Sequence, residues 1–405
     1  MTLHELVGSV LLLLSALALV PALVLFVELV AACVPGRAAQ PSEPADRAAL
    51  RTASLAVLMP AHDEAAGIEA AIRAIRAQLA PQDRLLVVAD NCGDATASVA
   101  RAVGAEVVER HDDQRRGKGY ALDFGVRWLE RAAPDVVVIV DADCIVAPQA
   151  LQHLAQRCLA SGRPVQALYL MQCPPGASVG MRIAEFAWVV KNQARPLGSA
   201  ALGGPCQLMG TGMAFPWSLI ERAPLATGHL VEDMQLGLDL ASAGTPPLFC
   251  PQAKVGSVFP TEDEGVRSQR TRWEHGHLSV IASAGPRLLW RALVQRNAML
   301  AAMVLDLMVP PLASLVLVLT VLLAIDAVWW LSGGGALALV LVALAIAGLV
   351  FAVGAAWVRY GRHLVTPREL LALPIYVAAK IPVYVRLFTK RQVEWVRTKR
   401  DERGR

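Results

Sequence analysis

The stretch Asp135-Val136-Val137-Val138-Ile139-Val140-Asp141-Ala142-Asp143-Cys144-Ile145-Val146 is the most informative in this chain. Its five consecutive β-branched residues show no polar alternation, which predicts a strand buried on both faces in a parallel sheet under helices. Open α/β sheets bind ligands at the carboxyl ends of their strands, where Asp141 and Asp143 follow. Their hard oxygen atoms suit Mg²⁺ or Mn²⁺ carrying phosphate oxygens. The alternative is an Asp-rich turn without a ligand.

Strand and helix patterns alternate in the chain before this stretch. The predicted strands are Leu55–Met59, Leu85–Ala89 and Glu106–Glu109. The predicted helices are Glu64–Ala80, a helix starting at Ala95, and a helix opened by Arg115-Arg116-Gly117-Lys118-Gly119 that runs through Trp128. This alternation predicts an α/β fold whose parallel sheet is built with right-handed crossovers.

Polar residues follow each of these strands. They are His62, Asp63 and Glu64 after the first strand, Asp90 and Asn91 after the second, and Asp141 and Asp143 after the central one. Carboxylates from three strand ends at one sheet edge predict a nucleotide-type ligand site. The chain has no G-x-x-x-x-G-K-[ST] loop, and no G-x-G-x-x-G follows the first strand, so a P-loop NTPase and a dinucleotide cofactor are not favoured.

The region after the central strand is less regular. Leu202–Phe215 is a Gly-rich loop running into an apolar strand, which indicates either close approach of backbone to a ligand or an ordinary turn. Glu232 and Asp233 open a predicted helix, where acidic residues also serve as caps. Gln269, Arg272 and Trp273 share one face of a later helix, and core packing is the alternative role for the Trp.

The composition predicts a mixed protein rather than a purely soluble one. The chain has 405 residues, of which 55% are hydrophobic and 18% charged. Apolar residues gather at both ends, around a central part of about 250 residues that is large enough for its own core. The net charge is +4 and no basic block interleaves with aromatic residues, so nucleic acid is not an expected partner. Seven cysteines without a C-x-x-C pair favour a reducing cytosol.

Three apolar stretches are long enough to cross a bilayer. They are Leu6–Cys33, Met299–Ile325 and Ala336–Val358. A signal peptide is the alternative for the first, but no Lys or Arg precedes it. Arg37, Arg47 and Arg51 follow it, so the positive-inside rule predicts an external N-terminus and a cytosolic central domain.

The predicted organisation has four parts. These are an N-terminal span (1–35), a linker (36–53), a cytosolic catalytic domain (54–280), and a membrane region with a cytosolic basic tail (281–405). Asp306 within the second apolar stretch is a functional candidate, as intramembrane carboxylates often are. Residues 326–335 are expected to form a short external turn, and Leu370–Phe388, punctuated by Pro and basic residues, an amphipathic interfacial helix.

The motifs, taken in order, resemble those of membrane-bound family 2 glycosyltransferases, the group of cellulose, chitin and hyaluronan synthases and ceramide glucosyltransferases. The motifs are Pro60-Ala61-His62-Asp63-Glu64, Asp90-Asn91-Cys92, Lys118, Asp141-x-Asp143, Glu232-Asp233 and Gln269-x-x-Arg272-Trp273. The resemblance covers about residues 50 to 290. It implies a GT-A-like fold with a mainly parallel sheet, a nucleotide-sugar donor that is usually UDP-linked, and an inverting displacement.

The resemblance also implies a role for each motif residue. The positions matched to nucleotide contacts are Pro60, Ala61, Glu64, Asp90, Lys118 and Asp141. The metal-holding pair is matched by Asp141 and Asp143, and the catalytic base by Asp233. The positions that line the acceptor and the diphosphate are matched by Glu232, Gln269, Arg272 and Trp273. The family often has Tyr-Asn where this chain has His62-Asp63, which leaves the identity of the base, and so UDP itself, open. Asp263 is the rival carboxylate for the role of base.

The resemblance therefore implies a metal-dependent transferase in a bacterial-type inner membrane, building an envelope glycolipid or polysaccharide. Its partners would be a nucleotide sugar, a lipid or glycan acceptor and the membrane. The alternatives are a processive synthase whose channel comes from an oligomer or partner subunit, and a catalytically silent nucleotide-sugar-binding subunit. Three spans offer almost no polar lining for a growing glycan, which favours the transfer of one or a few sugars.

Overall fold

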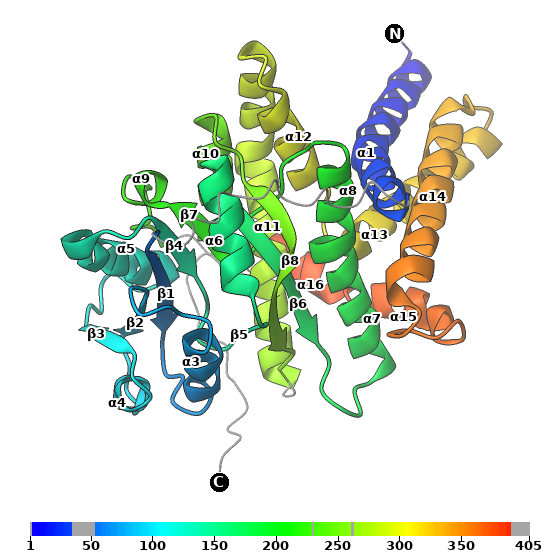
Figure 1. Cartoon of the computed structure of the whole chain (residues 1–405). Helices are drawn as coiled ribbons and strands as arrows, with labels where there is room; N and C mark the ends of the chain where they lie inside the picture. Colours follow the sequence, from blue (N-terminus) through cyan, green and yellow to red (C-terminus); the bar gives the residue numbers. More distant parts are fainter. Residues whose placement is uncertain (1, 35–52, 229–230, 261–262, 390–405) are drawn as a thin grey trace. The chain divides into compact units, whose positions relative to one another are not determined.

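The structure, a computed structural model, describes residues 2–34, 53–228, 231–260 and 263–389 (Figure 1). These residues divide into two compact units. The sheet unit takes in 53–175 and 205–276, and the helical unit takes in 2–34, 176–204 and 277–389. Residues 36–52 of the predicted linker and the tail 390–405 lie outside the described residues.

The described part of the sheet unit contains one sheet of eight strands, in the order β3-β2-β1-β4-β7-β6-β8-β5. The bounds are β1 Leu55–Ala61, β2 Arg84–Asp90, β3 Glu106–Arg110, β4 Val136–Ile139, β5 Ile145–Val146, β6 Val165–Gln172, β7 Met213–Pro216 and β8 Leu248–Val258. The pairs β3–β2, β2–β1, β1–β4 and β6–β8 are parallel. The predicted α/β fold with a mainly parallel sheet is confirmed.

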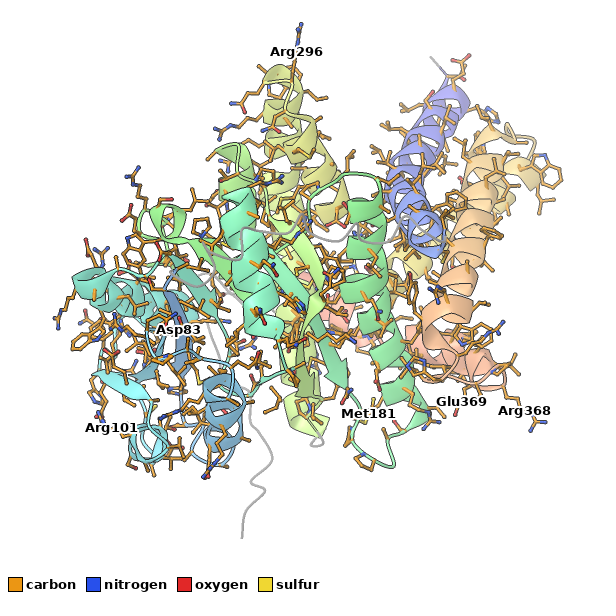
Figure 2. All side chains as sticks on the ribbon, in the orientation of Figure 1. Asp83, Arg101, Met181, Arg296, Arg368 and Glu369 are labelled. Atoms are coloured by element: carbon orange, nitrogen blue, oxygen red, sulfur yellow. The ribbon has the colours of Figure 1, made fainter. Side chains whose placement is uncertain are left out.

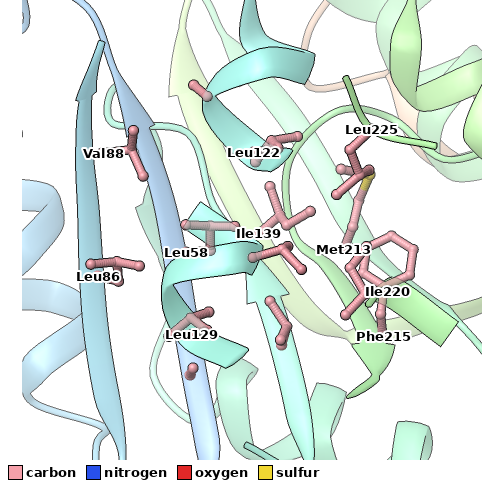
Figure 3. Close-up of a cluster of buried hydrophobic side chains, with 14 of the residues drawn as sticks. Leu58, Leu86, Val88, Leu122, Leu129, Ile139, Met213, Phe215, Ile220 and Leu225 are labelled. Carbon is pink, nitrogen blue, oxygen red and sulfur yellow. The ribbon is translucent and has the colours of Figure 1, made fainter. Parts of the chain in front are cut away.

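Three helices connect the parallel strands, as the alternating pattern predicts. They are α3 (Ile68–Arg76), α4 (Thr96–Ala102) and α5 (Lys118–Leu129). Ile68, Ile72 and Ile75 are fully buried at helical spacing on α3. Leu122 and Leu129 of α5 pack in the core cluster with side chains of β1, β2, β4 and β7, as Figure 3 shows. This core fixes the relative positions of the strands, and the polar residues lie at the ends of these strands.

The second half of the sheet is where the sequence predicts least. The chain forms α6 (Ala150–Ser161) and β6, then returns for β7, α9 (Trp217–Ile220), α10 (Glu232–Ser242) and β8. β7 lies antiparallel between β4 and β6, so it joins the two parallel groups of strands. Phe215 of β7 is fully buried in the core cluster (Figure 3).

In the helical unit, three described helices are long and apolar enough to cross a membrane. They are α1 (Leu3–Cys33), α13 (Leu312–Leu331) and the segment Leu337–Gly361, which consists of α14 (Leu337–Ala356) and a π-helical turn, η3 (Trp357–Gly361). The prediction of one N-terminal and two C-terminal apolar helices is therefore confirmed as a matter of length and composition.

The span predicted at 299–325 is wrong in its position. The structure has a short helix, α12 (Ala298–Leu307), and then α13 from Leu312. Pro310 and Pro311 separate the two helices, because proline lacks an N–H and restricts the residue before it. The predicted external turn also begins too early, since α13 continues to Leu331 and Asp326 is buried within it, accepting a hydrogen bond from Ser15 of α1 at 2.8 Å.

Residues 176–204 were placed by their sequence position in the central domain, but they belong to the helical unit. They form α7 (Val179–Val189), a π-helical turn η2 (Val190–Ala194), and α8 (Arg195–Ala201). Arg195 is buried, and its Nε donates to Glu28 of α1 at 2.8 Å. Its Nη2 donates to the backbone carbonyl of Asp306 at 2.7 Å and pairs with that carboxylate. The intramembrane candidate Asp306 is therefore one of three members of an ionic cluster around the buried Arg195.

The single interfacial helix predicted at 370–388 is divided in the structure. A 3₁₀ turn η4 (Glu369–Ala372), α15 (Leu373–Ala378) and α16 (Ile381–Thr389) replace it. Pro374 and Pro382 each fall at the start of a helix, where the missing N–H costs least. Arg368 precedes η4 and Glu369 begins it (Figure 2), while Leu371 of η4 and Ile375 of α15 are exposed. Helix α11 (Asp263–Val294) contributes residues to both units, and Arg296 lies in the turn that leads from it to α12 (Figure 2).

Candidate active site

The predicted site residues of β1, β2 and β4 lie at one edge of the sheet. Pro60 and Ala61 end β1, Asp90 ends β2, and Asp141 follows β4 after Val140. Since β1 pairs in parallel with both β2 and β4, their carboxyl ends share this edge. The edge is where ligands bind in open α/β sheets.

Lys118, the first residue of α5, binds two groups at this edge. Its Nζ forms an ion pair with Asp141 and donates a hydrogen bond to the carbonyl of Gly210 at 2.7 Å. Burial by itself would lower the pKa of Lys118, but the charges of Asp141, Glu232 and Asp233 raise it well above its usual value. Lys118 is therefore a permanent cation within a ring of carboxylates.

The backbone at Gly210 passes between Lys118 and Asp233. Gly210 has a φ of +87°, and a Cβ built on it would lie 3.3 Å from Oδ2 of Asp233 and 3.6 Å from Nζ of Lys118. Glycine suits both the backbone angle and the close approach. The next residue, Thr211, is fully buried, and its Oγ1 accepts a hydrogen bond from the amide of Asp141 at 3.1 Å. The Gly-rich loop is thus part of the site.

Glu232 and Asp233 are the first two residues of α10. Burial, followed by the negative charge of Asp233, raises the pKa of Glu232 to about 7, while Lys118 opposes the shift. Glu232 therefore exchanges a proton near neutral pH, beside the carboxylate matched to the catalytic base.

Asp90 is held by a residue that no predicted motif contains. Arg110, the last residue of β3, donates from Nη1 to Oδ1 of Asp90 at 2.6 Å, and both side chains are buried. Arg110 also donates from Nη2 to Asp112 and to the carbonyl of Arg115. Asn91 Nδ2 donates to the same Oδ1 at 3.1 Å. Oδ1 of Asp90 therefore accepts both of these hydrogen bonds, which fixes the orientation of the carboxylate.

The loop after β1 is fixed by the loop after β2. The amide of Glu64 donates to Oγ1 of Thr96 at 2.7 Å, and the amide of Gly93 donates to Oδ1 of Asp63 at 2.7 Å. Nδ1 of His62 hydrogen-bonds the carbonyl of Asp90 at 2.7 Å. Asp63 has a φ of +52°, a conformation that Asp tolerates better than most residues. His62 and Asp63, which stand where the family often has Tyr-Asn, therefore stabilise the conformation of these two loops through hydrogen bonds.

Ligand atoms of Asp141, Asp143 and Cys144 lie within 4.8 Å of one another. Burial raises the pKa of the Cys144 thiol well above its usual value, and the charges of the two Asp residues add to the effect. The thiol therefore stays protonated, which leaves two carboxylates as donors, Asp143 being exposed. Carboxylate donors fit Mg²⁺ or Mn²⁺ rather than a soft metal.

The last predicted motif, Gln269-x-x-Arg272-Trp273, lies on α11. Gln269, Arg272 and Trp273 are all within this helix, and the side chains of Arg272 and Trp273 are partly buried. The side chains of Gln269 and of Asp263 lie outside the described residues.

Sequence reasoning misses three residues that support the site. Arg110 orients Asp90, Thr211 accepts from the Asp141 amide, and Gln166 on β6 hydrogen-bonds the turn that contains Thr211. Only Thr211 carried a signal, because it lies in the Gly-rich loop. The other two contact their partners through the tertiary structure alone.

Comparison with solved structures shows a shared fold. The mannosyltransferase PcManGT from Pyrobaculum calidifontis, solved in complex with GDP-Man and Mn²⁺, has a TM-score of 0.53 and 19% identity, over 94% of this chain and 100% of that one. This likeness is one of fold, the GT-A-like α/β fold.

Two structures of glucosyl-3-phosphoglycerate synthase from Mycobacterium tuberculosis are less similar in structure. One, with Mn²⁺, UDP and phosphoglyceric acid, has 28% identity and a TM-score of 0.36 over 52% of this chain and 71% of that one. The other, with Mg²⁺ and UDP, has 26% identity and a TM-score of 0.36 over 52% and 72%.

No curated protein matches the chain. A sequence model described as "Glycosyltransferase like family 2" matches residues 53–276. This match takes in the whole sheet and the strand-end residues described above. Because it extends over more than half of the 405 residues, the protein belongs to the glycosyltransferase-like family 2.

Proposed function

We propose that this protein is a membrane-anchored, inverting glycosyltransferase that moves a sugar from a UDP-sugar to a lipid-linked or glycan acceptor. The observation that carries the proposal is the convergence of Lys118, Asp141 and Asp233 around the Gly210 turn. A buried cation beside carboxylates from separate elements is suited to a charged leaving group and a proton transfer.

Asp141 and Asp143 would hold the divalent cation. When bound there, Mg²⁺ or Mn²⁺ supplies Lewis-acid neutralisation of the diphosphate leaving group. The mannosyltransferase with the same fold was solved with Mn²⁺ and GDP-Man, which supports this assignment. Lys118 contributes a second positive charge, since its raised pKa keeps it protonated at every physiological pH.

Asp233 is the proposed base. The acceptor hydroxyl gives its proton to Asp233 as its oxygen bonds to the anomeric carbon, while the bond from that carbon to the diphosphate oxygen breaks. A single displacement of this kind inverts the anomeric centre. Glu232, Gln269, Arg272 and Trp273 are proposed to line the acceptor and the diphosphate, with the indole of Trp273 offering a flat apolar face to a sugar ring.

The carboxylate of Asp90 supports uracil as the base, with Pro60, Ala61 and Glu64 at the adjoining edge. Oδ1 of Asp90 already accepts from Arg110 and Asn91. Within the described part of the chain, Oδ2 is left to accept from a ligand, which matches the single N3–H of uracil. The paired N1–H and N2–H donors of guanine are best met by both oxygens of one carboxylate. In Asp90, Oδ1 already accepts hydrogen bonds from Arg110 and Asn91.

The apolar helices α1, α13 and α14 support membrane anchoring. Arg37, Arg47 and Arg51 after α1 favour a cytosolic sheet unit, a cytosolic C-terminus and an external N-terminus in an inner membrane of bacterial type. A lipid-linked acceptor would then meet the enzyme at the cytosolic face, in the synthesis of an envelope glycolipid or polysaccharide.

The test is turnover by the full chain in detergent micelles with a panel of UDP- and GDP-sugars, Mn²⁺ and a lipid extract, read as nucleotide release. We expect release of UDP from at least one UDP-sugar and little GDP release from any donor. Absence of turnover with the whole panel would favour a silent nucleotide-sugar-binding subunit. Preferential GDP release would contradict the role given to Asp90.

A further inference from the structure

The turn formed by residues 209–212 makes two hydrogen bonds to residues of the site and passes close to a third residue. The carbonyl of Gly210 accepts from Nζ of Lys118 at 2.7 Å, and Oγ1 of Thr211 accepts from the amide of Asp141 at 3.1 Å. The Cα of Gly210 faces the carboxylate of Asp233, 3.3 Å from where a Cβ would stand. The conformation of this turn therefore influences the positions of the ammonium group of Lys118, the backbone amide of Asp141 and the carboxylate of Asp233.

The turn is not a regular element and cannot hold itself in place. Gly210 and Gly212 have φ values of +87° and +65°. Glycine reaches this region easily but loses more conformational freedom than any other residue on being fixed there. Something outside the turn must restrict it.

Gln166 on β6 supplies that restraint. Its Oε1 accepts from the amide of Met209 at 2.9 Å, and its Nε2 donates to the carbonyl of Thr211 at 2.9 Å. The same Nε2 donates to the carbonyl of Ala167 at 2.9 Å. Gln166 is fully buried, so water does not compete for these groups. One side chain thus bonds the backbone on both sides of Gly210.

Only a primary amide of this length meets these demands. The site needs one acceptor and two N–H donors on one planar group, which is the inventory of glutamine. Glutamate at this position would keep the acceptor for Met209 but would set an oxygen against the carbonyls of Thr211 and Ala167. Methionine would fill a similar volume and make none of the three hydrogen bonds. Strand β6 alone would accept an apolar residue at this buried position. Glutamine is needed here because it forms hydrogen bonds with the backbone of the turn.

We propose that Gln166 is a positioning residue for glycosyl transfer, which fixes the turn at Gly210 and through it Asp141, Lys118 and Asp233. It touches neither donor nor acceptor. The proposal rests on the transfer reaction and metal site proposed above, and it adds a residue that lies outside all the predicted motifs. Groups that orient the residues holding a metal typically change metal affinity or activity by about 10–100-fold when they are removed.

The test compares the full chain with Gln166→Glu and Gln166→Met, using Ser54→Ala as the matched control. Ser54 donates a hydrogen bond from Oγ to Asp135 at 2.9 Å, at the amino end of β4, opposite to Asp141. It therefore reports the loss of a hydrogen bond next to the amino end of β4, away from the turn. We expect both Gln166 variants to lower kcat by about 10–100-fold and to raise the Mn²⁺ concentration for half-maximal rate, with a smaller change in the KM for the donor. The control should change none of these.

Two measurements do not depend on turnover. Amide hydrogen exchange should quicken at Met209 and, through Thr211, at Asp141 in the Gln166 variants but not in Ser54→Ala. Calorimetric titration of Mn²⁺ in the presence of UDP should show weaker binding to the Gln166 variants. Unchanged exchange at Asp141 together with unchanged Mn²⁺ binding would overturn the proposal, even for variants that lose stability.

A double-mutant cycle separates positioning from general destabilisation. Thr211→Val removes the hydroxyl that accepts from Asp141, so the part of the Gln166→Met effect that acts through Asp141 should be absent once it is present, while the part that acts through Lys118 and Asp233 remains. Full additivity of the two changes would contradict the proposal. If Gln166→Met does not fold, Gln166→Asn, which keeps the amide on a shorter chain, should show the same effects at smaller size.

The outcome for the proposed function is read separately. A wild-type chain that turns over no nucleotide sugar would refute glycosyl transfer, while the exchange data would still test the link from Gln166 to Asp141. An active wild-type chain with Gln166 variants equal to the control would refute the role of Gln166 alone.

Discussion

Asp233 and Glu232 are neighbours in sequence but differ in their surroundings. Asp233 faces Gly210, close to the ammonium of Lys118, whereas the pKa of Glu232 is raised to about 7 by burial first and by Asp233 second. We predict that Asp233→Asn lowers kcat by about 10²–10⁴-fold, because an amide cannot take the proton from the hydroxyl group of the acceptor substrate. Donor binding, measured by calorimetry with the UDP-sugar, should persist. The matched control is Asp263→Asn; if that variant is inactive and Asp233→Asn is active, Asp263 is the base.

Glu232 should make stability depend on pH. Its pKa in the folded state is about 7, above the usual 4.5, so the folded state binds the proton more tightly than the unfolded state does. Its contribution is therefore fully present below about pH 4.5 and is lost as the pH rises to about 7. We predict that Glu232→Gln removes this part of the decline in apparent Tm between pH 4.5 and 7. Parallel Tm curves for the two proteins would contradict the assignment.

Asp143 should be the residue on which metal dependence rests most directly. It is exposed, while Asp141 is already paired with Lys118. We predict that Asp143→Ala abolishes Mn²⁺-dependent turnover and leaves Tm nearly unchanged, because exposed positions contribute little to stability. Glu69→Ala, which removes an exposed carboxylate paired with Arg73 on α3, is the control. Activity of Asp143→Ala that persists in the presence of a chelator would refute the metal assignment.

At the scale of elements, the ionic cluster of Glu28, Arg195 and Asp306 joins α1, α8 and α12. Removing one member of a buried cluster leaves charge without compensation, so Arg195→Met should lower the stability of the helical unit by about 3–5 kcal/mol. Thermal unfolding in detergent measures this. Arg182→Met is the control, since its solvent-screened pair with Glu369 should contribute much less to stability.

A second variant distinguishes charge from packing at this cluster. Replacing all three residues by apolar ones of similar size should recover most of the stability, because the desolvation cost disappears together with the attraction. Gly198 of α8 approaches α1 closely, as a Cβ there would lie 1.8 Å from the carbonyl of Glu28. If the triple variant were as unstable as Arg195→Met, close packing rather than charge would hold these helices together.

At the scale of the whole molecule, the apolar helices bear on how many sugars the enzyme adds to one acceptor. Three apolar helices offer little polar lining to a growing glycan, and the carboxylates of Asp306 and Asp326 are both engaged, with Arg195 and with Ser15. We predict that the purified chain adds one or a few sugars to a lipid-linked acceptor. Mass spectrometry of the products measures this, and a ladder of long glycans made by the monomer without a partner subunit would contradict it.

Local patterns in the sequence were enough to predict the parallel strands, their crossover helices and the three apolar helices. The run Val136–Val140 and the spacing of Ile68, Ile72 and Ile75 report burial directly, because periodicity reflects which face is covered. The positions of Asp90 and Asp141 directly after predicted strands likewise predicted that both lie at one sheet edge, since parallel strands end together. Lys118 was assigned to the site only by the resemblance to the family. The pair Pro310-Pro311 was visible in the sequence too, but the apolar run around it was read as one span.

Contacts between distant residues could not be read in this way. Arg110 pairs with Asp90, Gln166 with the turn at Gly210, and Arg195 with Glu28. Each pair joins elements whose neighbourhood depends on strand order or helix packing, and none leaves a periodic signal in the chain. The helices within 176–204 belong to the helical unit for the same reason: the burial of Arg195 is favourable only once Glu28 and Asp306 surround it.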